Sequence, residues 1–206
     1  MNILTDRLPD TAAGYRIHTD YTRWITWERV LRDEDLTDQE RLTEMLLLVV
    51  EDPQSVKPED MQELLEALIQ FRAGPQGQDE HGTGSRQEIH RDDAYDYDID
   101  QSLILAAFRQ AYGIDLTTAS MHWWTFQALL QGLPDDTRFM RIVGYRTADT
   151  SQMPKETARQ YNTLKARYRI KRDRKPLTKE QAEQNMRDQI ANIYKRAQNA
   201  RRGGGQ

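Results

Sequence analysis

The aspartates and histidines between residues 81 and 100 form a cluster whose side-chain types could bind a metal ion. The group consists of His81, His90, Asp92, Asp93, Asp96, Asp98 and Asp100. Their carboxylate and imidazole groups could hold a divalent cation, but a calcium loop also needs a central glycine and a glutamate at position twelve, and this stretch lacks that pattern. The residues therefore favour a solvated loop that runs into a helix cap over a metal site, and we expect no cofactor.

His122, next to the tryptophan pair Trp123-Trp124, is the second candidate for chemistry, as a catalytic base. A base of this kind works with a nucleophile and an orienting acid, yet no serine or acid stands in a recognisable partner motif, and the G-x-S-x-G turn of hydrolases is absent. The chain has no cysteine, which excludes thiolate zinc sites and cysteine nucleophiles. We therefore expect a protein that is not an enzyme, in which His122 is structural or interfacial.

The tryptophan pair and the basic residues near the C-terminus are candidates for binding. Paired tryptophans favour core packing over a ligand cage, but an exposed ring would be a good anchor for a partner chain, because aromatic residues dominate interface hot spots. The basic run from Leu164 to Pro176, with a tyrosine interleaved, is the best candidate for nucleic acid. The whole chain is acidic, with a net charge of −4 and a pI near 5.6, so a protein partner or the acidic half of the chain itself is favoured over nucleic acid.

Charge is divided unevenly along the chain. Residues 137–206 hold 18 basic and 6 acidic side chains, whereas residues 1–136 hold 11 basic and 27 acidic ones. Such a division permits head-to-tail self-association, docking of the tail on the acidic part of the same chain, or contact between the basic tail and nucleic acid. Charge alone does not choose among these three.

Helical periodicity dominates the elements that must position these residues, so the expected fold class is mainly α. Near the N-terminus, the sequence predicts two short strands around a Thr11 to Gly14 turn. Capping residues and apolar spacing predict the helices. These run from Asp20 to about Leu31, from the Thr37 capping box to Glu51, from Pro58 to Arg72, from Asp98 or Asp100 to Gly113, around Met121 to Leu130, around Phe139 to Tyr145 after a cap at Asp135-Asp136, from Pro154 to Arg172, and from Thr178 to Arg201.

These elements suggest a helical core domain over residues 1–150, with a mobile loop at about 73–93, and a projecting basic helical extension over residues 151–206. The arginines of the helix around Phe139 to Tyr145 are expected to be exposed. The extension has narrow apolar stripes that can pack against one neighbour, in the same chain or another. The candidate partner-binding residues are Trp123, Trp124, Tyr161, Leu164, Arg167, Tyr168, Arg169, Lys171, Arg172, Met186, Ile190, Ile193 and Tyr194.

The central stretch also resembles a known family. The residues YGIDL at 112–116, HWWTFQALLQGLP at 122–134 and TRFMRIVGYR at 137–146 are similar to the gene product fifteen family of tailed phages, typical of siphophages of Gram-positive hosts. The opening GYRIHTDYTRWITWERVL at 14–31 agrees, and the resemblance covers roughly Met1 to Arg172. It rests on core residues and not on a catalytic signature, so it implies kinship more than mechanism.

Members of that family are typically encoded between the major tail protein and the tape-measure protein, which implies a chaperone of tail assembly. The expected partners are therefore the tape-measure protein, the major tail protein or both, with a homo-oligomer left open. No apolar run approaches the roughly 18 residues of a membrane span, and the N-terminus has no secretory pattern, so we expect the host cytoplasm and absence from the mature virion. A structural virion component and a nucleic-acid-binding protein are the alternatives.

Overall fold

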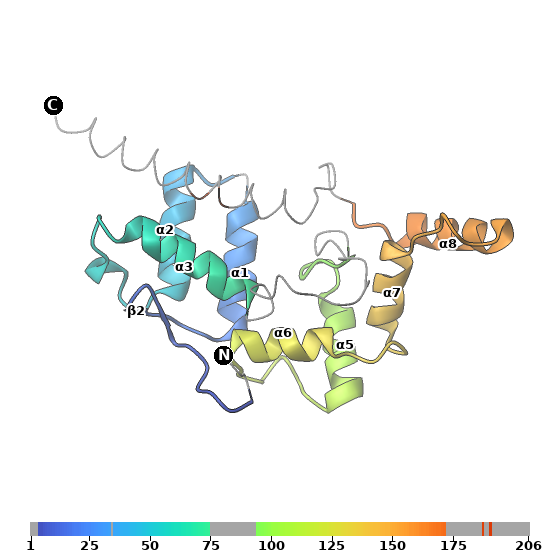
Figure 1. Ribbon diagram of the computed structural model, residues 1–206, viewed down its shortest axis with the longest axis horizontal. Coiled ribbons are helices and arrows are strands. Elements are labelled where there is room, and N and C mark those ends of the chain that lie inside the picture. The colour runs from blue at the N-terminus through green and yellow to red at the C-terminus, as the bar shows by residue number, and fades with distance from the viewer. Residues whose placement is uncertain (1–3, 34, 75–93, 172–186, 188–189, 191–206) are drawn as a thin grey trace. The chain divides into compact units, whose positions relative to one another are not determined.

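The computed structural model describes residues 4–33, 35–74 and 94–171, together with Arg187 and Ile190 (Figure 1). These residues form seven α-helices, one short 3-10 helix and one antiparallel hairpin, which confirms the prediction of a mainly helical fold with an N-terminal strand pair. The elements are β1 (Thr11–Ala12), β2 (Tyr15–Arg16), α1 (Tyr21–Arg32), α2 (Asp38–Val49), η1 (Pro53–Ser55), α3 (Met61–Ala73), α5 (Gln101–Tyr112), α6 (Trp123–Gln131), α7 (Arg138–Thr147) and α8 (Lys155–Tyr168). None of the helices in these ranges is long and apolar enough to span a membrane.

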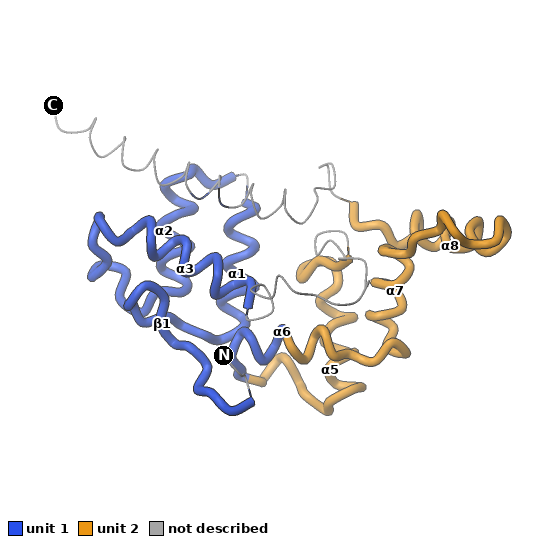
Figure 2. The backbone as a smooth tube through the Cα atoms, in the orientation of Figure 1, with its two compact units in different colours: residues 1–82, 120–127, 183–206 blue, residues 83–119, 128–182 orange. Residues whose placement is uncertain are grey.

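The chain separates into two compact units (Figure 2). Unit 1 comprises residues 1–82, 120–127 and 183–206, and unit 2 comprises residues 83–119 and 128–182, so the division falls within α6. The predicted domain boundary at residue 150 lies between α7 and α8 of unit 2 and stays a prediction. Most of the predicted loop at 73–93, and the predicted helix at 178–201 apart from Arg187 and Ile190, lie outside the described residues.

The N-terminal hairpin is tighter than the sequence suggested. Thr11 pairs with Arg16 and Ala12 with Tyr15, so Thr11 belongs to a strand and the turn consists only of Ala13 and Gly14. Both turn residues have positive φ, 46° and 81°, which matches the right-handed twist of a two-residue hairpin. The expectation of a turn beginning at Thr11 was wrong because this turn type needs only two residues.

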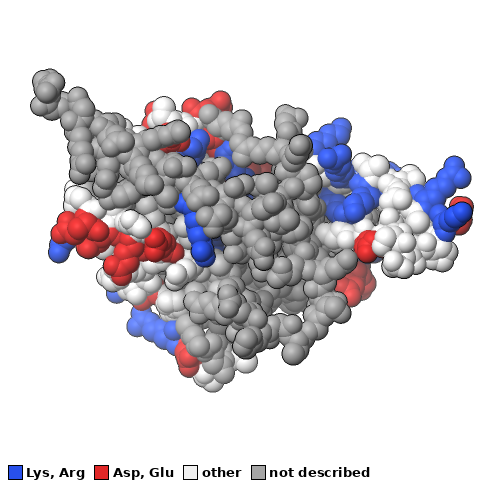
Figure 3. All heavy atoms as spheres, turned by 45° about the horizontal axis from the view of Figure 1, so that its top comes forward, with Lys and Arg blue, Asp and Glu red and all other residues white. Residues whose placement is uncertain are grey.

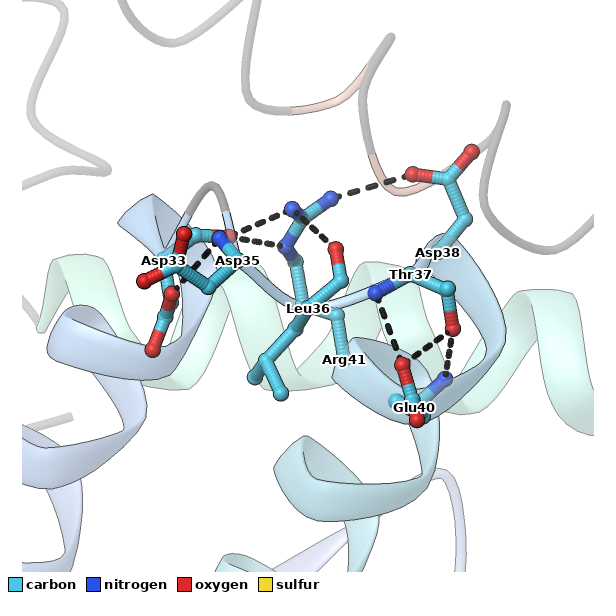
Figure 4. A network of polar contacts seen from close by, with 7 residues as sticks. All are labelled: Asp33, Asp35, Leu36, Thr37, Asp38, Glu40 and Arg41. Atoms are coloured by element: carbon cyan, nitrogen blue, oxygen red, sulfur yellow. Dashed lines mark hydrogen bonds and ion pairs between the residues drawn. The ribbon is translucent and has the colours of Figure 1, made fainter.

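Two predicted helix starts are confirmed in detail. Asp20 caps α1 by accepting a hydrogen bond from the backbone N–H of Thr22. At α2, the Thr37 hydroxyl accepts from the N–H of Glu40, and the Glu40 carboxylate accepts from the N–H of Thr37 (Figure 4). This reciprocal pair satisfies two backbone donors that a helix start leaves without intrahelical partners.

Two other predicted starts were wrong. The helix expected from Pro58 begins at Met61, after a turn at residues 58–60. The Asp60 carboxylate accepts from the Tyr15 hydroxyl, 2.7 Å away, so it makes no side-chain cap. The cap of α7 is Thr137 instead of Asp135 or Asp136. The Thr137 hydroxyl accepts from the N–H of Met140 and donates to the Pro134 carbonyl, and it is buried at 1% exposure.

Aromatic side chains fill the core of unit 1. Tyr21 stacks on Phe126 with ring centroids 4.7 Å apart, and Trp24 lies 4.7 Å from Phe71 and 6.4 Å from Trp123. These rings come from α1, α3 and the start of α6. Burying each of them stabilises the fold by about 1.5 to 3 kcal/mol, so this cluster holds the three helices in place.

The core of unit 2 is built from α5, the end of α6 and α7. Its buried side chains follow the helical spacing that the sequence predicted for these segments. They are Ile104, Ala107, Phe108, Leu130, Leu133, Phe139, Ile142 and Val143. Gly113 ends α5 with φ 69°, as predicted for a left-handed C-terminal cap.

Candidate partner-binding surface

His122 is fixed by hydrogen bonds on both ring nitrogens. Its Nδ1 accepts from the backbone N–H of Trp124 at 3.1 Å, so Nε2 carries the proton and donates to the Pro9 carbonyl at 3.0 Å. Burial lowers the pKa of His122 below its ordinary value, while the Pro9 carbonyl and Asp10 act in the opposite direction. This arrangement supports the structural interpretation of the histidine, because neither nitrogen is available to take a proton from a substrate.

The residues before α6 pair with those before α1. The N–H of Tyr21 donates to the Met121 carbonyl, and the N–H of Trp123 donates to the Thr19 carbonyl at 2.7 Å. The Ser120 hydroxyl donates to the Asp20 carboxylate at 3.0 Å. Burial acts to raise the pKa of Asp20, but hydrogen bonds from Thr22 and Ser120 outweigh it and lower that pKa. The start of α6 is thus tied to the start of α1.

The tryptophan pair has a role that periodicity did not show, because both indoles cap the end of α3. The Nε1–H of Trp123 donates to the Arg72 carbonyl at 2.9 Å, and that of Trp124 donates to the Phe71 carbonyl at 2.7 Å. The Gln127 side-chain amide adds a second donor to the Arg72 carbonyl at 3.0 Å. The last carbonyls of a helix have no intrahelical partner, so these three donors satisfy groups that would otherwise be costly to bury.

Gly74, which ends α3, makes this contact sterically feasible. Its φ is 79°, a conformation that residues with a side chain rarely adopt, and a Cβ at this position would lie 2.7 Å from Oε1 of Gln127. The backbone angle therefore requires a glycine at this point, and the absence of a Cβ leaves room for the end of the Gln127 side chain.

Burial separates the two tryptophans as candidate partner anchors. Trp123 is 0% exposed, so it offers no surface to a partner, and the core interpretation of this residue applies. Trp124 is half-buried, and its one hydrogen-bond donor is already used within the unit. Any partner contact by this pair would therefore be made by Trp124.

A buried ion pair joins three segments of unit 2. The Arg146 guanidinium binds the Asp100 carboxylate through two bonds of 2.6 and 2.9 Å, and the two side chains are only 6% and 2% exposed. Arg146 also donates to the carbonyls of Ala94 and Tyr168. The expectation that the arginines of this helix are exposed was wrong for Arg146, because each of its three side-chain nitrogens donates to a group inside the unit.

Asp100 correspondingly does not cap α5 through its side chain, although it is the first residue before that helix. Its carboxylate accepts from Arg146 and from the backbone N–H of Asp96. Asp96 in turn accepts from the N–H groups of Asp98 and Ile99. Within the described ranges, no three acidic or histidine side chains are grouped so that they could hold a metal ion. The aspartates from 96 to 100 act here as turn and anchoring residues.

The predicted apolar stripe of α8 packs against α7. The Tyr145 ring lies edge-on to Tyr161 with centroids 6.0 Å apart and stacks on Tyr168 at 5.9 Å. Tyr161, Leu164 and Tyr168 are all half-buried. The stripe therefore has a neighbour in its own unit, and this side of α8 is largely used for folding.

The opposite side of α8 is open and basic. It forms a shallow hollow lined by Lys155, Ala158, Arg159, Asn162, Thr163 and Ala166. Figure 3 shows blue Lys and Arg atoms gathered over α8, at the right of the view. Ala158 and Ala166 are small, so a second helix could approach closely at these two positions, beside the longer side chains of Lys155 and Arg159.

Basic residues continue past the end of α8. Arg167, Arg169 and Lys171 are exposed, and the Arg167 guanidinium carbon lies 5.6 Å from the centroid of the Tyr168 ring.

Of the remaining candidate partner-binding residues, Ile190 is helical and 3% exposed, so its side chain is not on the surface. Arg172, Met186, Ile193 and Tyr194 lie outside the described residues.

Comparisons with known proteins agree with the resemblance noted in the sequence. No curated protein matches the chain, and no solved structure matches it. The family model described as Bacteriophage Gp15 protein matches residues 4–170, which include every helix and strand described above. The chain is therefore a member of the Bacteriophage Gp15 protein family.

Proposed function

We propose that this phage protein is a non-enzymatic chaperone of siphophage tail assembly, which binds the tape-measure protein, the major tail protein or both in the host cytoplasm and is absent from the finished virion. The proposal rests on family membership together with one structural observation. That observation is a set of exposed cations held at the end of an anchored helix.

The anchoring comes from Arg146. Its Nε–H donates to the Tyr168 carbonyl at 2.6 Å, directly before Arg169, and Ile170 is buried at 8% exposure. Arg167 and Arg169 are exposed on either side of this anchored residue. A partner that meets them does not have to order the backbone that carries them, so less conformational entropy is lost on binding. A preformed cationic surface of this kind suits a transient protein contact.

Co-expression with the tape-measure protein of the same phage would test this proposal. We expect a soluble complex that co-purifies, and we expect Arg167→Glu/Arg169→Glu to weaken capture. Arg138→Glu/Arg141→Glu is the matched control, because these arginines are exposed on α7 of the same unit and the change in net charge is the same. If neither tail protein is captured by the unaltered chain, the chaperone proposal fails.

The two alternatives give different outcomes. A structural virion component would appear in stoichiometric amounts in mass spectra of purified virions, whereas a chaperone would be missing or strongly substoichiometric.

The exposed cations from Lys165 to Lys171 also favour a test with nucleic acid. Binding at low salt that falls steeply as salt is added would support that function, and no binding at low salt would end it.

A further inference from the structure

The open face of α8 has a counterpart of opposite charge on α2. Glu40, Thr43, Glu44 and Leu47 follow the i, i+3, i+4, i+7 spacing of one helical stripe, and all four are exposed. Lys155, Ala158, Arg159 and Asn162 follow the same spacing on α8. One stripe therefore carries two carboxylates where the other carries two cations.

The apolar content of the two stripes is also complementary. Leu47 is 53% exposed in the last turn of α2, next to the half-buried Leu48. The hollow on α8 has small side chains, Ala158 and Ala166, in its lining. A leucine that enters such a hollow loses apolar surface to water, and alanines allow two helix axes to approach to about 8 to 10 Å.

Net charge agrees with this pairing. Residues 4–74, in the N-terminal part of unit 1, hold 16 acidic and 8 basic side chains in the sequence. Residues 155–171, in and just after α8, hold 6 basic side chains and 1 acidic one. Opposite net charges attract over distances up to about a Debye length, roughly 10 Å at 0.1 M salt, so the wider surfaces favour the same contact as the two stripes.

We propose that the chain self-associates, with the Glu40/Glu44/Leu47 stripe of α2 in one copy docked on the Lys155/Arg159 hollow of α8 in another. The second copy is the occupant because the complementary stripe, matched in spacing, charge and apolar content, lies on this chain. The contact joins two different patches, so it closes into a two-fold dimer if each copy gives both patches to the same partner. Otherwise it is heterologous and extends into a ring or a chain of copies. One helix pair buries less than a standard interface, so the association is weak and sensitive to salt.

Sedimentation velocity of the purified chain alone tests this inference independently of any tail protein. We expect the mean sedimentation coefficient to rise with protein concentration at about 50 mM salt and to lose most of this rise at about 0.5 M. Glu44→Lys and Arg159→Glu should each weaken association by about three- to tenfold, as expected for reversal of an exposed ion pair. Glu66→Lys, an equal charge change at an exposed position of α3, should leave association unchanged.

An equimolar mixture of the Glu44→Lys and Arg159→Glu variants tests whether the two reversed charges together restore association. The lysine introduced in one variant then meets the glutamate introduced in the other, so the mixture should associate more strongly than either variant alone. Far-UV circular dichroism of each variant verifies that the fold is intact.

Three outcomes would each overturn the inference: a chain that stays monomeric at low salt, a Glu44→Lys variant that associates as strongly as the unaltered chain, or a mixture that associates no more strongly than either variant alone. Capture of the tape-measure protein by a monomeric chain would overturn self-association while leaving the chaperone proposal standing.

Discussion

The two units bury a carboxylate in different ways. In unit 1, Glu28 is 3% exposed and pairs with Arg72 at 3.1 Å and with Arg32 at 3.4 Å, and the Arg32 side chain is 37% exposed. In unit 2, Asp100 and Arg146 are both almost fully enclosed. Glu28 thus has two cationic partners and a route to solvent, whereas Asp100 depends on one. The fold should therefore depend more on the single cationic partner of Asp100 than on either partner of Glu28.

The largest expected effect is that of Arg146→Met. Removal of the guanidinium leaves the Asp100 carboxylate buried without its cation, which costs about 3 to 5 kcal/mol of the free energy of unfolding. It also removes the donors to the Ala94 and Tyr168 carbonyls. Urea denaturation followed by far-UV circular dichroism measures the loss, and Asp100→Asn/Arg146→Met should recover part of it. A loss below about 1 kcal/mol would show that water reaches this pair.

Trp123→Phe, in unit 1, should have the next largest effect and lower the free energy of unfolding by about 2 to 3 kcal/mol. The substitution removes a donor to the Arg72 carbonyl and leaves a cavity where the larger ring was, although Gln127 still serves that carbonyl. Trp124→Phe is the matched comparison, because the indole of this half-buried residue also caps α3. Its loss should be smaller, and equal losses would argue against burial as the difference between the two rings.

Arg72→Met tests the comparison of ion pairs directly. We expect the free energy of unfolding to fall by about 1 to 2 kcal/mol. This loss is smaller than for Arg146→Met because Glu28 keeps Arg32 as a partner. The Arg72 carbonyl, which accepts from Trp123 and Gln127, belongs to the backbone and is unaffected. The same urea experiment measures it, with Arg32→Met as the companion variant. A loss as large as that of Arg146→Met would remove the distinction between the units.

The smallest expected effect is a pH dependence from His122. Its pKa is lowered in the folded state from an ordinary value of 6.5, so the unfolded chain takes up a proton first as the pH falls. The stability contribution of the neutral ring is therefore complete above pH 6.5 and is lost as the pH falls from 6.5 through the folded pKa. Thermal unfolding of the parent chain and of His122→Gln across this window should show a flatter pH profile for the variant. Parallel profiles would mean that the ring does not titrate differently on folding.

Local signals in the sequence were enough for most elements of the fold. Capping at Asp20, the Thr37 box and Gly113 depends on residues a few positions apart, and each was predicted correctly. At the start of α3, the sequence did not show that the Asp60 carboxylate would accept from Tyr15, a residue 45 positions away. Periodicity records which face of a helix is apolar, and it does not record which distant group a polar side chain will meet.

The same limit explains what was missed in the candidate site. Arg146 belongs to a helix whose other arginines, Arg138 and Arg141, are exposed, and it differs because it meets Asp100 and two backbone carbonyls, none of which is near it in the sequence. The capping of α3 by Trp123 and Trp124 likewise joins residues more than 50 positions apart. The basic character of α8 was predicted from composition alone, because exposed charge needs no particular partner.

The placement of the tryptophans has a spectroscopic consequence. All four, Trp24, Trp27, Trp123 and Trp124, belong to unit 1, and three of them have no exposed surface. Unit 2 contains tyrosines but no tryptophan. Excitation of indole therefore reports on unit 1 alone, while circular dichroism reports on the helices of both units. Fluorescence and dichroism curves that separate during unfolding would show that the two units melt independently.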